Sequence, residues 1–150
     1  MCVMSKARKA TAVIVLVIIL LAVSAIVLGH HKWNRRDFST LGPVTSVTVV
    51  GLDGSKALVK ITDPQVVFQI VAFVDSRRTG WETPWYGIPV PTVRAEFFNG
   101  AHFKGSFGSG ANFFETHREG VFCSQSASSS EVRGFLDLLG VDGNGQLTSR

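Results

Sequence analysis

The strongest constraint on this chain is a run of twenty residues without a charged side chain, from Ala10 to Gly29. At about 1.5 Å per helical residue the run spans about 30 Å, the thickness of a bilayer's hydrocarbon core. In lipid the backbone has to satisfy its own hydrogen bonds, and a helix does so. The sequence therefore predicts a transmembrane helix at residues 10–29, preceded by a short basic tail at residues 1–9.

A cleaved secretory signal is the competing interpretation of this segment. Lys6, Arg8 and Lys9 would form its basic start, and Val23-Ser24-Ala25 offers small residues that a signal peptidase accepts. The apolar run is longer than the roughly 7–15 residues of a typical signal core. This length favours a retained signal anchor.

Basic residues flank the predicted helix on both sides, so the charge difference that sets its orientation in the membrane is small. Three come before it and three after it: Lys6, Arg8, Lys9, and Lys32, Arg35, Arg36. The α-amino group adds a positive charge before the helix and Asp37 offsets one beyond it, which favours a cytoplasmic N-terminus and a domain outside. The reverse orientation stays open. Trp33 and the second basic cluster would lie among the lipid headgroups, in a juxtamembrane linker at residues 30–40.

The remainder of the chain has the composition of one soluble domain that is not basic. From Phe38 to Arg150 nine Lys and Arg face ten Asp and Glu, a net charge of −1. Without a basic surface the electrostatic contribution that dominates nucleic-acid binding is missing, so we expect no nucleic-acid partner. The glycine-rich run at residues 105–110 lacks a phosphate-binding ending, and His30-His31 lacks a third metal ligand. We therefore expect no cofactor and no metal.

Three turns ending in glycine predict three β-hairpins. For the turns at Gly54 and Gly100, a three-residue loop separates apolar from polar residues best. The registers that follow place Val49 opposite Ala57, Val47 opposite Val59, Phe97 opposite Ala101, Ala95 opposite Phe103 and Val93 opposite Gly105. At Gly120 the same loop places Phe114 with Phe122 on one face, and Glu115, His117 and Cys123 on the other.

Two helices are predicted from their caps and periodicity. Asp63-Pro64 is typical of an N-cap followed by proline at the first helical position, and predicts a helix from Pro64 to about Arg78. Ser128 and Glu131 form a capping box for a second helix that ends at Gly140. The order β-β-α-β-β-β-β-α predicts an α+β fold of two layers at residues 41–141, with both helices on one face of a mostly antiparallel sheet. Residues 142–150 are expected to be a flexible tail.

The candidate ligand-binding residues are Trp81, Trp85 and Tyr86, in a proline-rich segment that cannot form a helix. Exposed rings there would bind a sugar, a proline-rich peptide or lipid headgroups. The alternative is that Trp81 and Trp85 fold back over the core. A second candidate surface is a polar sheet face with Arg94, Glu96, His102 and Lys104, extended by Glu115 and His117; mutual ion pairing would make it an ordinary solvated face.

An enzymatic alternative centres on Cys123, with His117 or His102 as the base and Glu115 as the orienting group. This would be a membrane-tethered thiol-dependent hydrolase or transferase. No cysteine-hydrolase motif surrounds Cys123, and a lone strand cysteine is commonly a small buried apolar residue. The sequence therefore favours a noncatalytic, single-pass membrane protein whose domain binds a protein or envelope component.

Overall fold

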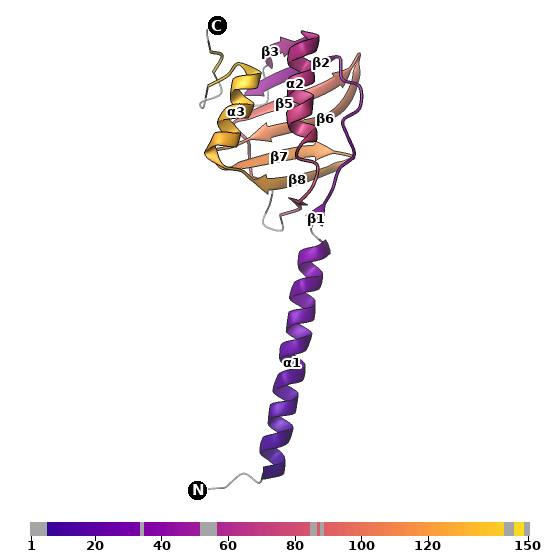
Figure 1. Ribbon diagram of the computed structural model, residues 1–150, viewed down its shortest axis with the longest axis vertical. Helices are drawn as coiled ribbons and strands as arrows, with labels where there is room; N and C mark the ends of the chain where they lie inside the picture. Colours follow the sequence, from indigo (N-terminus) through magenta and orange to yellow (C-terminus); the bar gives the residue numbers. More distant parts are fainter. Residues whose placement is uncertain are drawn as a thin grey trace. The chain divides into compact units, whose positions relative to one another are not determined.

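The computed structural model describes residues 6–33, 35–51, 57–84, 87, 89–142 and 146–148. The chain divides into two compact units, Met1–Arg35 and Arg36–Arg150. Each unit is described by itself. The first is dominated by one helix, and the second contains the sheet (Figure 1).

The first unit is helix α1, Lys6–Trp33, which is 28 residues long. Large apolar side chains from Val13 to Ile26 are exposed, each by between 48% and 68%. The hydroxyl of Ser24 donates to the carbonyl of Leu20 at 2.8 Å, so this polar group is satisfied within the helix. By the combined measure of helix length, mean hydropathy and charge, no helix among the described residues qualifies as a membrane span.

The second unit is an α+β fold, as the sequence predicts. Its described residues form an antiparallel sheet of eight strands in the order β1-β4-β8-β7-β6-β5-β2-β3. The strands are β1 (Arg35–Arg36), β2 (Ser46–Gly51), β3 (Ala57–Ile61), β4 (Trp81–Glu82), β5 (Val93–Asn99), β6 (His102–Ser109), β7 (Phe113–Arg118) and β8 (Val121–Ser126). The helices are α2 (Pro64–Asp75) and α3 (Ser129–Leu139). Both helices cover the same face of the sheet (Figure 1), and we call the opposite face the open face.

The two helices form where their caps predict. The carboxylate of Asp63 accepts from the backbone N–H groups of Gln65 and Val66 at 2.8 and 3.1 Å, which satisfies two orphan donors at the start of α2. Ser128 and Glu131 form the reciprocal capping box of α3, and Gly140 ends that helix with a φ of 69°. Helix α2 ends at Asp75, three residues before the predicted end.

The core lies between the helices and the sheet and is rich in phenylalanine. The ring of Phe107 lies 4.9 Å from that of Phe114 and 5.0 Å from that of Phe135, measured between centroids. Phe73 of α2 stacks on Phe135 of α3 at 5.3 Å, which joins the two helices. Phe38, which lies within the linker predicted at residues 30–40, is also buried in this core.

The predicted register of the β5–β6 hairpin is wrong. Asn99 pairs with His102 across a two-residue turn, and Phe98 pairs with Phe103. A bulge then inserts Lys104, so that Phe97 lies opposite Gly105 and Ala95 opposite Phe107. The bulge turns Phe107 toward the helices while Phe103 keeps the other face, a division that an unbroken period of two does not allow.

The other two hairpins also differ from their predicted registers. In β2–β3 Val47 pairs with Ile61 and Val49 with Val59, a shift of two residues that keeps the same side chains on the covered face. The predicted turn at Gly54 lies outside the described residues. In β7–β8 the turn has two residues, Glu119 and Gly120, both with positive φ. This shorter turn changes which side chains of β7 and β8 share a face.

The described part of the C-terminal tail folds back on the domain. Val141 is buried and forms an isolated bridge with Leu147. The backbone N–H of Asp142 donates to the carbonyl of Gln146 at 2.8 Å. These bonds join described residues of the predicted tail to each other and to the domain, and the flexibility of the tail stays a prediction.

Candidate functional site

Trp81 is a core residue, which corrects the expectation that it binds ligand. It is 1% exposed, and its ring meets those of Phe38 and Phe107 edge-on at 6.2 and 5.7 Å. Its indole N–H donates to the carbonyl of Arg77 at 2.5 Å, so the polar group of this buried ring is satisfied. Trp85 and Tyr86 lie outside the described residues, and their part in binding stays a prediction.

The residues of the enzymatic alternative lie on opposite faces of the sheet. Cys123 pairs with Thr116 and is fully buried in the core, whereas Glu115 pairs with Ser124. Because side chains alternate along a strand, Glu115 and His117 face the open side and the thiol of Cys123 faces the helices. The predicted pairing of Glu115 with Cys123 is therefore wrong.

His102 does not supply the missing base. Cys123 pairs with Thr116, and Thr116 pairs with Phe107 of β6. His102 lies five residues from Phe107 along the same strand, at the turn of the β5–β6 hairpin. Five strand residues span roughly 16 Å, too far for a hydrogen bond. The thiol instead lies 3.6 Å from the hydroxyl of Thr83.

Part of the predicted polar surface does assemble on the open face. Nε of Arg94 donates to a carboxylate oxygen of Glu115 at 2.7 Å, and only 2% of the Glu115 side chain is exposed. Glu96 and His117 both lie opposite Ser106, so they share this face. Lys104 leaves the predicted alternation because it is the inserted residue of the bulge.

Four rings from four adjacent strands form a row on the open face, which we call the aromatic row: Phe98, Phe103, His117 and Phe122. His117 stacks on Phe122 at 4.0 Å with 6° between the rings. Phe103 lies 6.1 Å from His117 and 5.7 Å from Phe98. Phe103 is 49% and Phe122 39% exposed. At about 200 Å² per ring, these two present less than about 200 Å², far below the roughly 800 Å² per partner of a stable protein interface.

Pro91, at the end of the proline-rich segment before β5, lies over the open face. Pro91 is buried and covers Gly108, where a Cβ atom would lie 2.8 Å from the Cβ of Pro91 and 3.0 Å from the Cγ of Glu115. Glycine at position 108 is thus the residue that lets this segment approach the sheet. The covering explains how a charged side chain such as Glu115 is buried on the face without helices.

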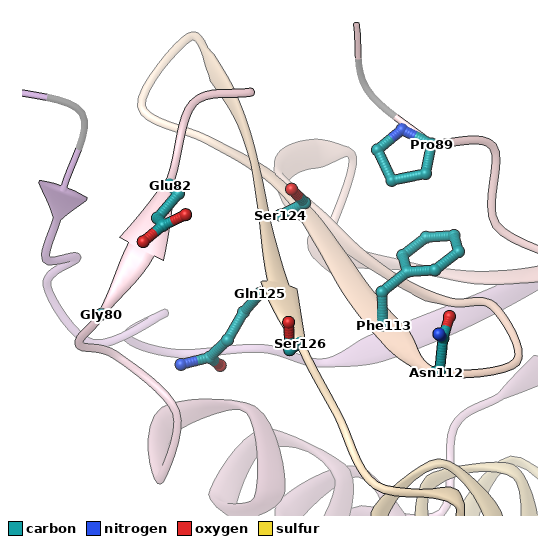
Figure 2. Close-up of a pocket in the computed structure, with 8 residues that line it drawn as sticks. All are labelled: Gly80, Glu82, Pro89, Asn112, Phe113, Ser124, Gln125 and Ser126. Carbon is teal, nitrogen blue, oxygen red and sulfur yellow. The ribbon is translucent and has the colours of Figure 1, made fainter. Parts of the chain in front are cut away.

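A cleft of about 580 Å³ opens beside this segment, and we call it the open-face cleft (Figure 2). Ser124 and Ser126 of β8 lie along its floor, with Glu82 on one side and the rings of Phe113 and Pro89 on the other (Figure 2). The full lining is Gly80, Glu82, Pro89, Asn112, Phe113, Ser124, Gln125 and Ser126. Its size lies within the range of about 300–1,000 Å³ for small-molecule sites.

The ring of Phe113 is held against backbone. A Cβ atom at Gly110 would lie 2.1 Å from Cε1 of Phe113 and 2.4 Å from its Cζ, so the ring rests directly on Gly110. The backbone N–H of Gly110 donates to the carbonyl of Phe113 at 3.0 Å, which fixes the intervening turn. The ring of Phe113 is therefore a positioned apolar surface at the end of the β6–β7 hairpin.

A second polar cluster fixes the N-terminal segment of the domain to the sheet. Arg118 is buried, donates to the carbonyl of Ser39 and lies 3.8 Å from Asp75. Desolvation lowers the pKa of Arg118, while the charges of Asp75 and Glu119 oppose the shift. Hydrogen bonds from the side chain and backbone of Ser39 lower the pKa of Glu119. These groups bond to one another and hold the chain near Phe38, so we interpret the cluster as structural.

The sequence gives only one sign of the open-face cleft, namely the prolines of the segment at residues 84–91. Among the described residues, no group of three or more His, Cys, Asp or Glu is arranged to hold a metal ion. Comparisons with protein-family models, with curated proteins and with solved structures find no match to this chain. The geometry of the open face is therefore the basis for the functional inference.

Proposed function

We propose that this is a single-pass membrane protein whose α+β domain is a noncatalytic binding module outside the cytoplasm. The uncharged run at residues 10–29 and the exposed apolar side chains of α1 support the anchor, because such surface is unfavourable in water. Charge at the two ends of the run supports a cytoplasmic N-terminus. The ligand is a protein or envelope component near the bilayer.

The open-face cleft is the observation that carries the binding role. It joins an apolar surface, formed by Phe113 and Pro89, to the amide of Asn112 and to hydroxyl, amide and carboxylate groups of β8 and β4. Small-molecule sites combine these two kinds of surface, since apolar contact supplies affinity and the few polar groups supply orientation. The separation of Cys123 from Glu115 and His117 removes the geometric support for the hydrolase or transferase alternative.

Site-specific photocrosslinking tests the binding role in cells that produce the full chain. A photoreactive residue at Asn112, an exposed part of the cleft, is expected to give a discrete crosslinked product in the membrane fraction. The same residue at Gln69, which is exposed on α2, is the matched control. The proposal fails if Asn112 gives no product, or only the products seen at Gln69.

The membrane anchor has its own test. The full chain is expected to stay with membranes after an alkaline wash and to be released by detergent, because only an embedded segment resists removal of surface charge interactions. Replacing two residues of the run, Leu20 and Leu21, by Asp should release it, since each buried charge opposes insertion strongly. Full-length wild-type chain in the detergent-free soluble fraction would contradict the anchor.

A further inference from the structure

We propose that the open-face cleft binds a neutral saccharide. This inference rests on the proposed function, whose site it shares, and adds the chemical class of the ligand. Three properties of the cleft point to that class: a positioned aromatic surface, a surrounding set of hydrogen-bonding oxygens and nitrogens, and a described lining without a cationic side chain.

The aromatic surface is the ring of Phe113. Gly110 lies against its Cε1 and Cζ atoms, and Figure 2 shows the ring beside the cleft with Pro89 next to it. A pyranose ring has an apolar face of C–H groups with slight positive charge, and the face of an aromatic ring is slightly negative. The two surfaces match in shape and in charge distribution, so a sugar ring can stack on Phe113.

The hydrogen-bonding groups lie around this ring. Ser124 and Ser126 carry hydroxyl groups, Asn112 carries an amide, and Glu82 carries a carboxylate. Hydroxyl and amide groups both donate and accept, as the hydroxyl groups of a sugar do. An amphipathic sugar thus finds an apolar surface for its ring face and polar partners for its edge.

The charge of the cleft disfavours anionic ligands. Among its described lining residues there is no Lys, Arg or His. Phosphate or carboxylate ligands are held in proteins by Arg, Lys or clustered backbone N–H groups. A neutral ligand needs no cationic side chain.

An extended peptide fits the site less well. Peptides that bind to sheets add a strand to a free edge through main-chain hydrogen bonds. The edge of β8 at the cleft is already occupied, because Ser124 pairs with Glu82 of β4. The cleft therefore offers its side chains rather than a strand edge.

Calorimetric titration of the full chain in lipid nanodiscs tests the proposal with three probes: cellotriose, chitotriose and the anionic trigalacturonate. At least one neutral trisaccharide is expected to bind, and trigalacturonate to bind more weakly. Phe113→Leu, which keeps apolar volume but removes the planar ring, should weaken binding by about tenfold. Phe122→Leu, the same change in the aromatic row, is the matched control and should leave binding unchanged. Gly110→Ala should weaken binding because its methyl group displaces the ring.

Each other outcome contradicts the saccharide assignment. Absence of binding by both neutral probes at about 10 mM, well above a millimolar dissociation constant, overturns it. Tighter binding of trigalacturonate, or a loss with Phe122→Leu but not with Phe113→Leu, does the same. If these titrations fail while the crosslink from Asn112 persists, the ligand class is wrong and the binding module stands. If the crosslink is also absent, the proposed function fails as well.

Discussion

Substitution of Gly108 by Ala tests whether the proline-rich segment covers the open face as described. Gly108 lies in β6, and its φ is not in the left-handed region, so alanine can adopt the same backbone conformation. The new methyl group would lie 2.8 and 2.9 Å from two carbon atoms of Pro91 and 3.0 Å from Cγ of Glu115. The steric contact with Pro91 is therefore what the substitution changes.

The magnitude follows from these distances. Non-bonded carbon atoms rest at about 3.5–4.0 Å, so the methyl group overlaps the proline ring by about 0.7 Å or more. Pro91 is buried and its ring is rigid, so the segment has to shift. Overpacking of this kind costs about 1–3 kcal/mol. Replacing glycine by alanine returns about 0.4–1 kcal/mol by reducing the freedom of the unfolded chain. The free energy of unfolding should therefore fall, by about 1.3 kcal/mol at the middle of these ranges and by at most about 2.6 kcal/mol.

Denaturant unfolding of the full chain in detergent measures this change. Gly134→Ala is the matched control: this glycine lies in α3 with no atom within 4 Å of the added methyl group, so alanine should stabilise by about 0.5–1 kcal/mol. In the double variant, Pro91→Ala should relieve part of the cost of Gly108→Ala, a coupling that a mutant cycle isolates. The reasoning is refuted if Gly108→Ala stabilises the domain as Gly134→Ala does.

Three further predictions concern buried and charged groups. The thiol of Cys123, which is fully buried, should react with a thiol reagent only after denaturation; rapid reaction of the folded chain would contradict its placement. Arg94→Met should lower the free energy of unfolding, because it leaves the buried carboxylate of Glu115 without its ion-pair partner. Since the Arg94 side chain is a third exposed, we expect a loss near the low end of about 3–5 kcal/mol. Adding Glu115→Gln should restore part of this loss, and an unchanged stability of Arg94→Met would refute the role of the ion pair. Hydrogen bonds from the backbone and hydroxyl of Ser128, and then from Arg77, lower the pKa of Glu131 from 4.5 to about 2. The ionised Glu131 carboxylate therefore stabilises the fold fully above about pH 4.5, and this stabilisation is lost as the pH falls toward 2. Unfolding curves across this pH range should therefore vary less for Glu131→Gln than for wild type, and identical pH profiles would contradict the assignment.

Local interactions made the two helices of the domain predictable. Asp63 and Ser128 bond to backbone groups two or three residues away, and the apolar periodicity of each helix is complete within its own segment. Such local features can be recognised within a short stretch of the sequence, without knowledge of the tertiary structure. The α+β class follows from them and from the hairpin turns, because alternating and helical patterns have to share one core.

The strand registers depended on features that the local pattern does not contain. The bulge at Lys104 lets both Phe97 and Phe107 be buried in the core, where Phe107 packs against Phe73 of α2 and Phe135 of α3. The predicted register assigned the apolar residues of both strands to the face that packs on the core, and so placed Phe103 in the core. The structure instead leaves Phe103 on the open face, where Phe98 and His117 partly cover it.

The open-face cleft was the least predictable feature, because its parts are far apart in sequence. Glu82, Pro89 and Phe113 belong to three segments that meet only after the strands have paired in the order observed. Trp81 shows the same dependence, since one of its ring partners, Phe38, comes 43 residues earlier along the chain. The number of aromatic residues in this segment suggested binding, but packing against Phe38 and Phe107 places Trp81 in the core.

Two prolines of this segment, Pro89 and Pro91, have described contacts with the sheet or its cleft. Proline restricts the unfolded chain, so a proline-rich segment loses less conformational entropy when it becomes ordered than another loop of the same length. Pro91 seated on Gly108 and Pro89 beside Phe113 can thus be held over the sheet by few contacts. A cleft whose walls are ordered before the ligand arrives loses little further entropy on binding. Such preorganisation would compensate for the modest apolar area that one ring offers, which is the physical reason why a small, hydroxyl-rich ligand suits the proposed site.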